Sequence, residues 1–214
     1  MKMPSTNNIR RCHWVGDDPL YIAYHDREWG FPVDDDRRLF EKICLEGFQA
    51  GLSWRTILGK RDAFREAFAG FDFDRVARFG ARDVQRLLRN AGIVRHRGKI
   101  ESTVNNAKRA QEMVAEFGSV AAYFWRYEPH AKTRPKRLTR EALATMSTST
   151  ESIALSKDLK KRGWTFVGPT TVYAFMQAMG LVNDHVHDCA VRRAVVDARK
   201  HFRIPAPTQV TADQ

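Results

Sequence analysis

Apolar residues recur at helical spacing along most of this chain, and no segment shows the alternation of a half-buried strand or an internal repeat. The spacing predicts helices over seven segments: 34–54, 61–69, 72–78, 82–91, 97–117, 151–162 and 169–182. Ser149 or Thr150 can cap the helix at 151–162. Between these segments, 119–127 is rich in aromatic residues and 129–150 has the composition of a loop. The pattern predicts an all-α protein.

The most informative position is Glu46, within the predicted helix 34–54. Three aspartates at 34–36 suit the positive end of the helix dipole. One face of the helix is formed by positions spaced i, i+4, i+7 and i+11: Leu39, Ile43, Glu46 and Ala50. A carboxylate on this otherwise apolar face must be paired, hydrogen-bonded or turned toward a cavity, because an unpaired buried charge is costly. Two interpretations stay open: a functional carboxylate in a cleft, or a structural ion pair with an arginine.

Composition changes the picture mainly through charge. The 214 residues are 43% hydrophobic with five tryptophans, which is typical of one folded core or of two small lobes that share one. Thirty-six Lys and Arg against 25 Asp and Glu give a net charge of +11. This excess favours a polyanionic partner, with nucleic acid before an anionic membrane surface. A soluble protein that is merely basic is the alternative.

The chain carries no apolar run long enough to span a bilayer, and its first residues, MKMPSTNNIRR, lack the apolar region of a secretory signal. Cys12, Cys44 and Cys189 are odd in number and widely spaced, so they predict free thiols in a reducing cytoplasm rather than disulfides. We expect one unit over 1–200 and a flexible tail over 201–214, frayed from about residue 204.

Basic residues gather in one stretch: between Arg78 and Arg109 there are nine Lys and Arg against two acidic residues. At its centre the string NAGIVRHRGKI joins two predicted helices near 82–110. A glycine-containing turn followed by a helix N-terminus suits a phosphate. The residues placed around it are Gly92, Arg95, His96, Arg97, Gly98 and Lys99. A solvated basic loop is the ordinary alternative.

Four residues form a plausible metal-ligand set: Cys12, His25, His185 and Cys189. The last two are four residues apart and share a face if 184–190 is helical. A Cys2His2 set makes a closed zinc site, structural rather than catalytic. The spacing does not match a zinc finger, and buried cysteines or paired histidines are commonplace. His13, His187 and Asp188 are competing ligands.

Aromatic residues surround Glu46 in the sequence: Trp14, Tyr21, Tyr24, Trp29, Phe31, Phe40, Phe48 and Trp54. Most aromatics at helical spacing are core, but beside one carboxylate they can also stack on a flat amine-bearing heterocycle. Gly51 permits close approach of the backbone, and an exposed Leu52 can wedge into a base stack. The alternative is a helix cap at Gly51 and a core role for Leu52.

Five blocks carry a resemblance to a known family: CHWVGDDPLYIAYHDREWG, LFEKICLEGFQAGLSW, AGIVRHRGKI, KKRGWTFVGPT and GLVNDHVHDC. In that order they resemble the bacterial 3-methyladenine DNA glycosylases over nearly all of 12–189. The resemblance implies an all-α helix–hairpin–helix glycosylase fold with two helical lobes and a base pocket between them. It implies hydrolysis of the N-glycosidic bond of 3-methyladenine, which leaves an abasic site.

The resemblance also assigns residues. It implies one structural Zn²⁺ per chain on Cys12, His25, His185 and Cys189, which would tie the two ends of the chain together. It implies that Glu46 and Tyr24 hydrogen-bond the methylated base, that Trp54 stacks on it, and that Trp29 lies in the pocket wall.

For DNA, the resemblance places Gly51 and Leu52 at the gap left in the duplex and 92–99 on the phosphates. The catalytic Asp that usually follows the hairpin in this superfamily is absent. Glu101 is the nearest acid, and we do not interpret it as catalytic. No motif positions a nucleophilic lysine, so a monofunctional enzyme is expected.

The expected partner is double-stranded DNA containing 3-methyladenine, with no nucleotide cofactor and no membrane. The expected state is a monomer in the bacterial cytoplasm, associated with the nucleoid through DNA. Two other classes stay open. A zinc-stabilised, non-enzymatic DNA-binding protein fits the charge but gives Glu46 no purpose. A metal-dependent nuclease needs an open metal position, which a closed Cys2His2 site does not offer.

Overall fold

A computed structural model describes residues 9–135 and 137–207, and every regular element in these ranges is helical. The α-helices are α1 (Pro19–Arg27), α2 (Asp36–Gln49), α3 (Trp54–Gly59), α4 (Arg61–Ala67), α5 (Phe73–Val76), α6 (Ala81–Arg89), α7 (Arg97–Phe117), α8 (Val120–Phe124), α9 (Arg140–Thr145), α10 (Thr150–Lys161), α11 (Pro169–Ala178) and α12 (Arg192–His201). Short 3-10 helices are η2 (Ala69–Phe71), η3 (Trp125–Tyr127) and η4 (Ala131–Thr133). The predicted all-α class is confirmed for this part of the chain.

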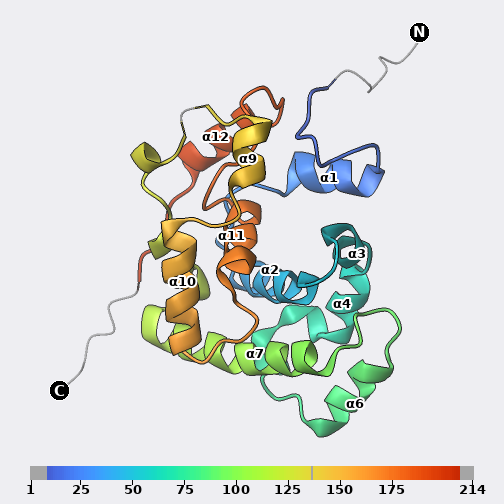
Figure 1. The fold of residues 1–214 in the computed structure, drawn as a ribbon. Coiled ribbons are helices and arrows are strands. Elements are labelled where there is room, and N and C mark those ends of the chain that lie inside the picture. The colour runs from blue at the N-terminus through green and yellow to red at the C-terminus, as the bar shows by residue number, and fades with distance from the viewer. Residues whose placement is uncertain (1–8, 136, 208–214) are drawn as a thin grey trace, which may run out of the picture.

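Helix α2 lies at the centre of the molecule and packs against α3, α7, α8 and α11 (Figure 1). Asp35 caps it by accepting a hydrogen bond from the backbone N–H of Arg38 at 2.7 Å. Residues 39–48 are buried on all sides, so the predicted apolar face is only part of the buried surface. Ala50, which was predicted on that face, lies beyond the helix and is exposed.

The predicted long helix at 97–117 is confirmed as α7, with the same bounds. It begins after His96, whose Nδ1 accepts a hydrogen bond from the backbone N–H of Lys99 at 3.2 Å. It ends at Gly118, whose φ of +83° is the left-handed conformation common after helices. Residues 90–96 connect α6 to α7, and α6 packs against α7 at one end of the molecule (Figure 1).

Several helices differ from the prediction. Helices α1, α3, α8 and α12 were not predicted as separate elements, and α9 lies within the loop-like stretch 129–150. Ser149 caps α10, which confirms one of the two predicted caps. Helix α11 ends at Ala178 instead of reaching residue 182. The cause is Gly180, whose φ is +79° and whose backbone lies so close to Phe31 that a side chain would not fit.

The two chain ends are only partly described. His201 is the last residue of α12, and the ring of Phe202 packs 4.5 Å from that of Trp125, so order extends into the predicted tail. The remainder of that tail, 208–214, and the N-terminal segment 1–8 lie outside the described residues. Among the described helices, none has the length and apolar character needed to span a membrane.

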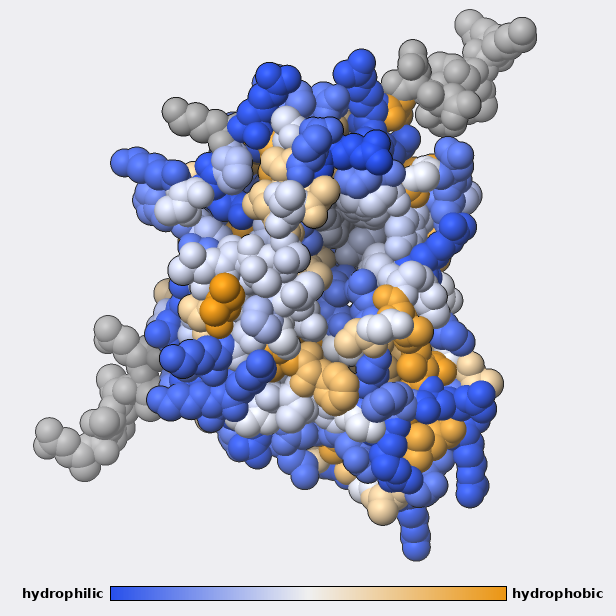
Figure 2. Space-filling model, in the orientation of Figure 1, coloured by the Kyte–Doolittle hydropathy of each residue, from blue (hydrophilic) through white to orange (hydrophobic). Residues whose placement is uncertain are grey.

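A cavity opens on the face drawn in Figure 2, where the surface is hollowed between α11 on one side and α1 and α3 on the other. Helix α2 supplies the floor of this cavity through Glu46 and Gln49, and α9 adds Leu143 and Ala144 to its rim. The central helix α2 therefore places two polar side chains, Glu46 and Gln49, in the cavity between the outer helices.

Candidate functional site

The cavity has a volume of about 410 Å³, and its lining is rich in aromatic side chains. Its lining residues are His13, Trp14, Tyr21, Tyr24, Trp29, Glu46, Gln49, Trp54, Leu143, Ala144, Met146, Ala174 and Gln177. A space of this size with a few converging polar groups is typical of small-molecule sites. The predicted residues Glu46, Tyr24, Trp54 and Trp29 are all among its lining. Residues from α9 and α11 were not predicted, because their contribution depends on how distant helices pack.

Glu46 is 5% exposed and pairs with a residue that the sequence interpretation missed. Lys42 lies one turn earlier on α2, and its Nζ is 2.6 Å from Glu46 Oε1. The same Nζ donates to the Tyr24 hydroxyl at 2.9 Å and lies 3.2 Å from the ring centre of Trp54. The carboxylate is therefore both paired and turned toward a cavity, and its partner is a lysine, not an arginine. The i, i+4 spacing was the available signal.

Burial governs the protonation of this group. Desolvation lowers the pKa of Lys42, while the neighbouring carboxylate of Glu46 opposes the change. Desolvation, reinforced by the negative charge of Glu46, raises the pKa of Tyr24 well above its ordinary value. Tyr24 is therefore a neutral phenol at physiological pH and can donate a hydrogen bond.

The aromatic walls offer both ring faces and ring edges. The rings of Tyr24 and Trp54 lie 5.4 Å apart at 44°, and those of Trp14 and Trp29 meet edge to face at 5.1 Å. The indole N–H of Trp54 is buried and has no hydrogen-bond partner among the residues that the structure describes. Such walls suit a flat heterocycle, because every aromatic base has a face that stacks.

A second cluster lies behind the cavity wall. The side chains of Cys12, His25, His185 and Cys189 are buried, and their ligand atoms all lie within 4.8 Å of one another. The measured separations are 3.7 Å (Cys12 Sγ to His185 Nδ1), 3.5 Å (Cys189 Sγ to His25 Nε2), 3.4 Å (Cys189 Sγ to His185 Nδ1) and 3.1 Å (His185 Nδ1 to His25 Nε2). Tetrahedral zinc, with bonds of about 2.0–2.3 Å, needs edges of about 3.3–3.8 Å. Three of these four separations lie in that range and the fourth, between the two histidines, is slightly shorter, so the donor set fits a four-coordinate metal.

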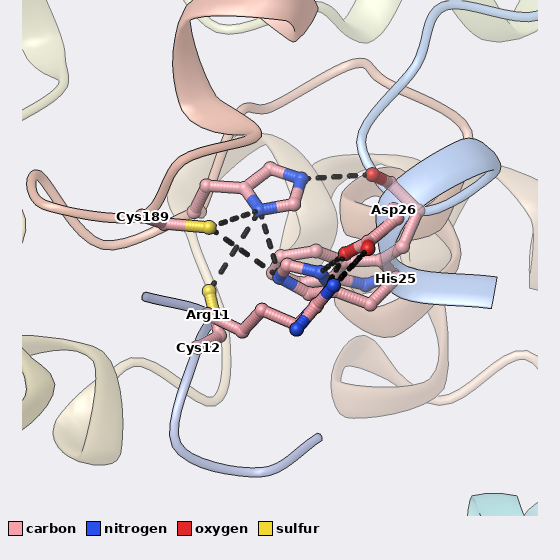
Figure 3. A network of polar contacts seen from close by, with 7 residues as sticks. Arg11, Cys12, His25, Asp26 and Cys189 are labelled. Carbon is pink, nitrogen blue, oxygen red and sulfur yellow. Dashed lines mark hydrogen bonds and ion pairs between the residues drawn. The ribbon is translucent and has the colours of Figure 1, made fainter. Parts of the chain in front are cut away.

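The partners of both imidazoles also suit a metal site. His25 Nδ1 lies 2.7 Å from Asp26 Oδ1, and Asp26 accepts hydrogen bonds from both Nε and Nη2 of Arg11 (Figure 3). His185 Nε2 lies 2.9 Å from the carbonyl oxygen of Trp29. Such partners hold the proton on the outer nitrogen and leave the inner one free to bind metal. Residues 184–190 form turns rather than a helix, so the ligands at 185 and 189 converge by a different route from the one predicted.

The Leu52 loop, residues 50–53, connects α2 to α3. Gly51 has φ +81°, with no neighbour within 4 Å of the place a side chain would take, and Leu52 is 42% exposed. Leu52 therefore is not a core residue. Ser53 caps α3 by accepting a hydrogen bond from the Thr56 N–H, and this cap positions Trp54 at the first turn.

In the basic connection between α6 and α7, only some of the basic side chains are exposed and available for a phosphate. Arg95 and Arg97 are exposed, although Arg97 pairs with Glu101 at 3.1 Å. The N–H of Gly92 donates to Asn90 Oδ1, and Gly98 lies half-buried in the first turn of α7.

Lys99 departs from the expectation of a phosphate contact. Its side chain is buried, and its Nζ donates to the carbonyl oxygen of Phe48 at 2.9 Å and also to that of Ala50. The ammonium thus satisfies carbonyl groups at the C-terminal end of α2, where a cation is favourable. This lysine links the first turn of α7 to the Leu52 loop.

Comparison with known proteins gives one family. The model of the methyladenine glycosylase family matches residues 14–193. The chain belongs to this family. It is 50% identical over 182 residues to the DNA-3-methyladenine glycosylase 1 of Escherichia coli (strain K12), covering 85% of this chain and 96% of that protein.

Solved structures of the family have the same fold. A crystal structure of a 3-methyladenine DNA glycosylase I has a TM-score of 0.76 at 49% identity, covering 85% of this chain and 98% of the other. The Staphylococcus aureus 3-methyladenine DNA glycosylase I, whose structure describes recognition of 3-methyladenine, has a TM-score of 0.78 at 37% identity, covering 85% and 96%.

The family match spans the cavity but not every element around it. It includes Glu46, Lys42 and three of the four clustered ligands, while Cys12 precedes it. Most of α12 follows it. This helix is held by Arg199, which pairs with Glu128 at 2.6 Å, so the segment beyond the family match packs as part of the same unit.

Proposed function

We propose that this methyladenine glycosylase removes 3-methyladenine from alkylated double-stranded DNA by hydrolysing the N-glycosidic bond. The observation that carries the proposal is a buried carboxylate and a neutral phenol, Glu46 and Tyr24, in an aromatic cavity of about 410 Å³. The relatives that share the fold are named as 3-methyladenine DNA glycosylases. The same cavity would hold the base after it leaves the helix.

The reaction needs few catalytic groups. Methylation at N3 makes adenine cationic, and cleavage of the C1′–N9 bond releases it neutral, so no general acid is needed. Water then captures the oxocarbenium-like sugar and leaves an abasic site. In our proposal, Glu46 accepts a hydrogen bond from the exocyclic amine and Trp54 stacks on the ring. These contacts exist before the transition state as well as in it, so they act chiefly on binding and selectivity.

The DNA contacts follow from exposure and charge. We propose that Leu52, at 42% exposure, fills the space that the extruded nucleotide leaves, and that Gly51 lets the backbone approach. Arg95, Arg97 and the start of α7 would contact phosphates, consistent with the net charge of +11. The helix–hairpin–helix assignment to α6 and α7 is part of this proposal, as is action as a monomer.

We also propose that the cluster of Cys12, His25, His185 and Cys189 holds one structural Zn²⁺. The inter-ligand distances and the outer partners of the two histidines support it. The four protein ligands would leave no open coordination position, so the metal would stabilise the packing of the two chain ends rather than take part in hydrolysis. No disulfide joins Cys12, Cys44 and Cys189, and this together with the DNA substrate supports a place in the bacterial cytoplasm, at the nucleoid.

Incubation of the protein with methylated duplex DNA, followed by chromatography of the released bases, tests the function. Release of 3-methyladenine with 7-methylguanine left in place is the expected outcome. Tight DNA binding and bound zinc without any released base would overturn the proposal in favour of a non-enzymatic DNA-binding protein.

A further inference from the structure

Lys42 is a buried cation that base recognition, as proposed above, leaves without a role. Its side chain contacts three residues assigned to the base: Nζ lies 2.6 Å from Glu46 Oε1, 2.9 Å from Tyr24 Oη and 3.2 Å from the ring centre of Trp54. Its exposed fraction is 5%. A buried ammonium at the junction of three recognition residues must affect what those residues can recognise, because it decides which of their lone pairs are already occupied.

Lys42 acts from behind the cavity wall. Tyr24 and Trp54 line both the base cavity and a small space on its far side, whereas Lys42 lines only the small space. The salt bridge between Glu28 and Arg61, at 2.6 Å, borders the same small space. Lys42 is therefore a positioning residue: a base in the cavity would meet the groups that it holds and not the ammonium itself.

Hydrogen-bond valence gives the consequence. An ammonium can only donate, so the Tyr24 oxygen acts as an acceptor toward Lys42 and its own O–H proton is directed elsewhere. Glu46 Oε1 is likewise occupied, which leaves Oε2 to accept from the cavity. The hydroxyl oxygen of Tyr24 and Oε1 of Glu46 both contact Lys42 Nζ, so they lie near each other. Without Lys42, the Tyr24 hydroxyl would be free to donate a hydrogen bond to the Glu46 carboxylate. Lys42 prevents that internal bond from consuming both groups.

We propose that Lys42 sets the hydrogen-bond polarity of the pocket, making Tyr24 a donor and Glu46 an acceptor, and so selects methylated adenine over methylated guanine. This inference rests on the proposed function. Adenine presents an amine donor at N6 beside an acceptor at N7, whereas guanine presents two acceptors, O6 and N7. One donor beside one acceptor matches the adenine edge, and a guanine would place O6 against the carboxylate.

Single-turnover excision by Lys42→Met tests the proposal, with 3-methyladenine and 3-methylguanine quantified from the same methylated duplex. A lost hydrogen bond to a charged group changes binding by about tenfold or more, so we expect the excision ratio of 3-methyladenine to 3-methylguanine to fall by about tenfold. DNA affinity should not change. A ratio equal to that of the wild type, with both rates intact or both slowed alike, would overturn the proposal.

Three further variants keep the test decisive. Lys42→Arg keeps a charged donor and should restore most of the ratio, whereas Lys42→Gln keeps an uncharged donor and serves if the Met variant does not fold. In a Tyr24→Phe background, Lys42→Met should change the ratio much less, because the hydroxyl that it orients is gone. If the effects of Lys42→Met and Tyr24→Phe on the ratio are fully additive in this double-mutant cycle, Lys42 does not act by orienting the Tyr24 hydroxyl. If the wild-type protein releases neither base, the proposed function itself fails, which is a different result from an unchanged ratio.

Discussion

Two groups of buried polar side chains lie on opposite sides of Trp14 and Trp29. One group is enclosed by protein on all sides, and the other opens into the cavity. In the candidate metal cluster, formed by Cys12, His25, His185 and Cys189, the possible ligand atoms face one another and the outer nitrogen of each imidazole meets a fixed oxygen. In the cavity around Glu46, which we propose binds the base, the polar edges meet partners on one side and open space on the other. Closure suits a group that stabilises the fold, whereas an open side suits a group that recognises a ligand.

Because Trp14 and Trp29 contact both regions, the shape of the cavity depends on the Cys/His cluster, whereas the cluster does not depend on the polar groups of the cavity. The carbonyl of Trp29 accepts from His185 at 2.9 Å, while the same residue lines the base cavity. Trp14 packs 5.3 Å from the ring of His25 and also lines the cavity. Loss of the metal cluster should therefore disturb the cavity, but removal of a single polar group from the cavity should leave the cluster intact.

The largest expected effect is that of Cys189→Ser. A structural zinc contributes many kcal/mol to folding, and about 1 kcal/mol corresponds to about 2–4 °C in a chain of this size. We expect zinc content to fall from one per chain to near zero and the melting temperature to fall by more than about 10 °C. Elemental analysis and a thermal melt measure both quantities.

Cys44→Ser is the matched control, since Cys44 is also buried but lies outside the metal cluster. It should keep its zinc. A Cys189→Ser protein with full zinc and the wild-type melting temperature would contradict the closed metal site and remove one side of the comparison.

Glu46→Gln should give the next largest effect, confined to the open region. Hydrogen bonds to charged groups contribute about 1.5–3 kcal/mol, so excision of 3-methyladenine should slow by about 10–100-fold while zinc content stays at one per chain. Single-turnover kinetics on methylated duplex, with enzyme below saturation so that binding contributes to the rate, measure the effect. Glu41→Gln is the control, because Glu41 lies on the same helix but pairs with Arg65 away from the cavity. Wild-type excision by Glu46→Gln would remove this residue from the site.

The sequence predicted elements whose signals are local. Helix α7 was predicted to the residue, because a long apolar period lies between His96 and Gly118, which are a cap and a stop. Helix α1 was missed although Asp18 and Pro19 form a good start signal, since its apolar residues do not gather on one face. Helix α9 has six residues, too few to show a period, and only its packing beside the cavity gives it a role.

The candidate site shows the same limit. Periodicity identified Glu46 as a carboxylate on a buried helix, but it could not show that α2 is buried all round and that Lys42 is therefore its partner. Spacing could not bring His25 and His185 together either, because 160 residues separate them and only the tertiary fold closes that distance. The sequence predicted Lys99 to be a surface cation, because it lies in a basic string. In the structure it is buried, because the last carbonyl groups of α2 have no partner within the helix and accept hydrogen bonds from its ammonium.

The smallest effect should come from Leu52→Ala, which touches neither region. Leu52 is 42% exposed and does not line the cavity, so the free base should bind the variant with unchanged affinity. Holding a nucleotide outside the helix costs a few kcal/mol, and loss of an inserted side chain removes only part of the compensation, so excision from duplex should slow by about two- to fivefold. Ile153→Ala is the control, since Ile153 is a similarly exposed residue on α10. Equal excision rates for both variants would show that extrusion of the nucleotide does not depend on Leu52. The contacts in the cavity around Glu46 would then have to supply all of the free energy that holds the nucleotide outside the duplex.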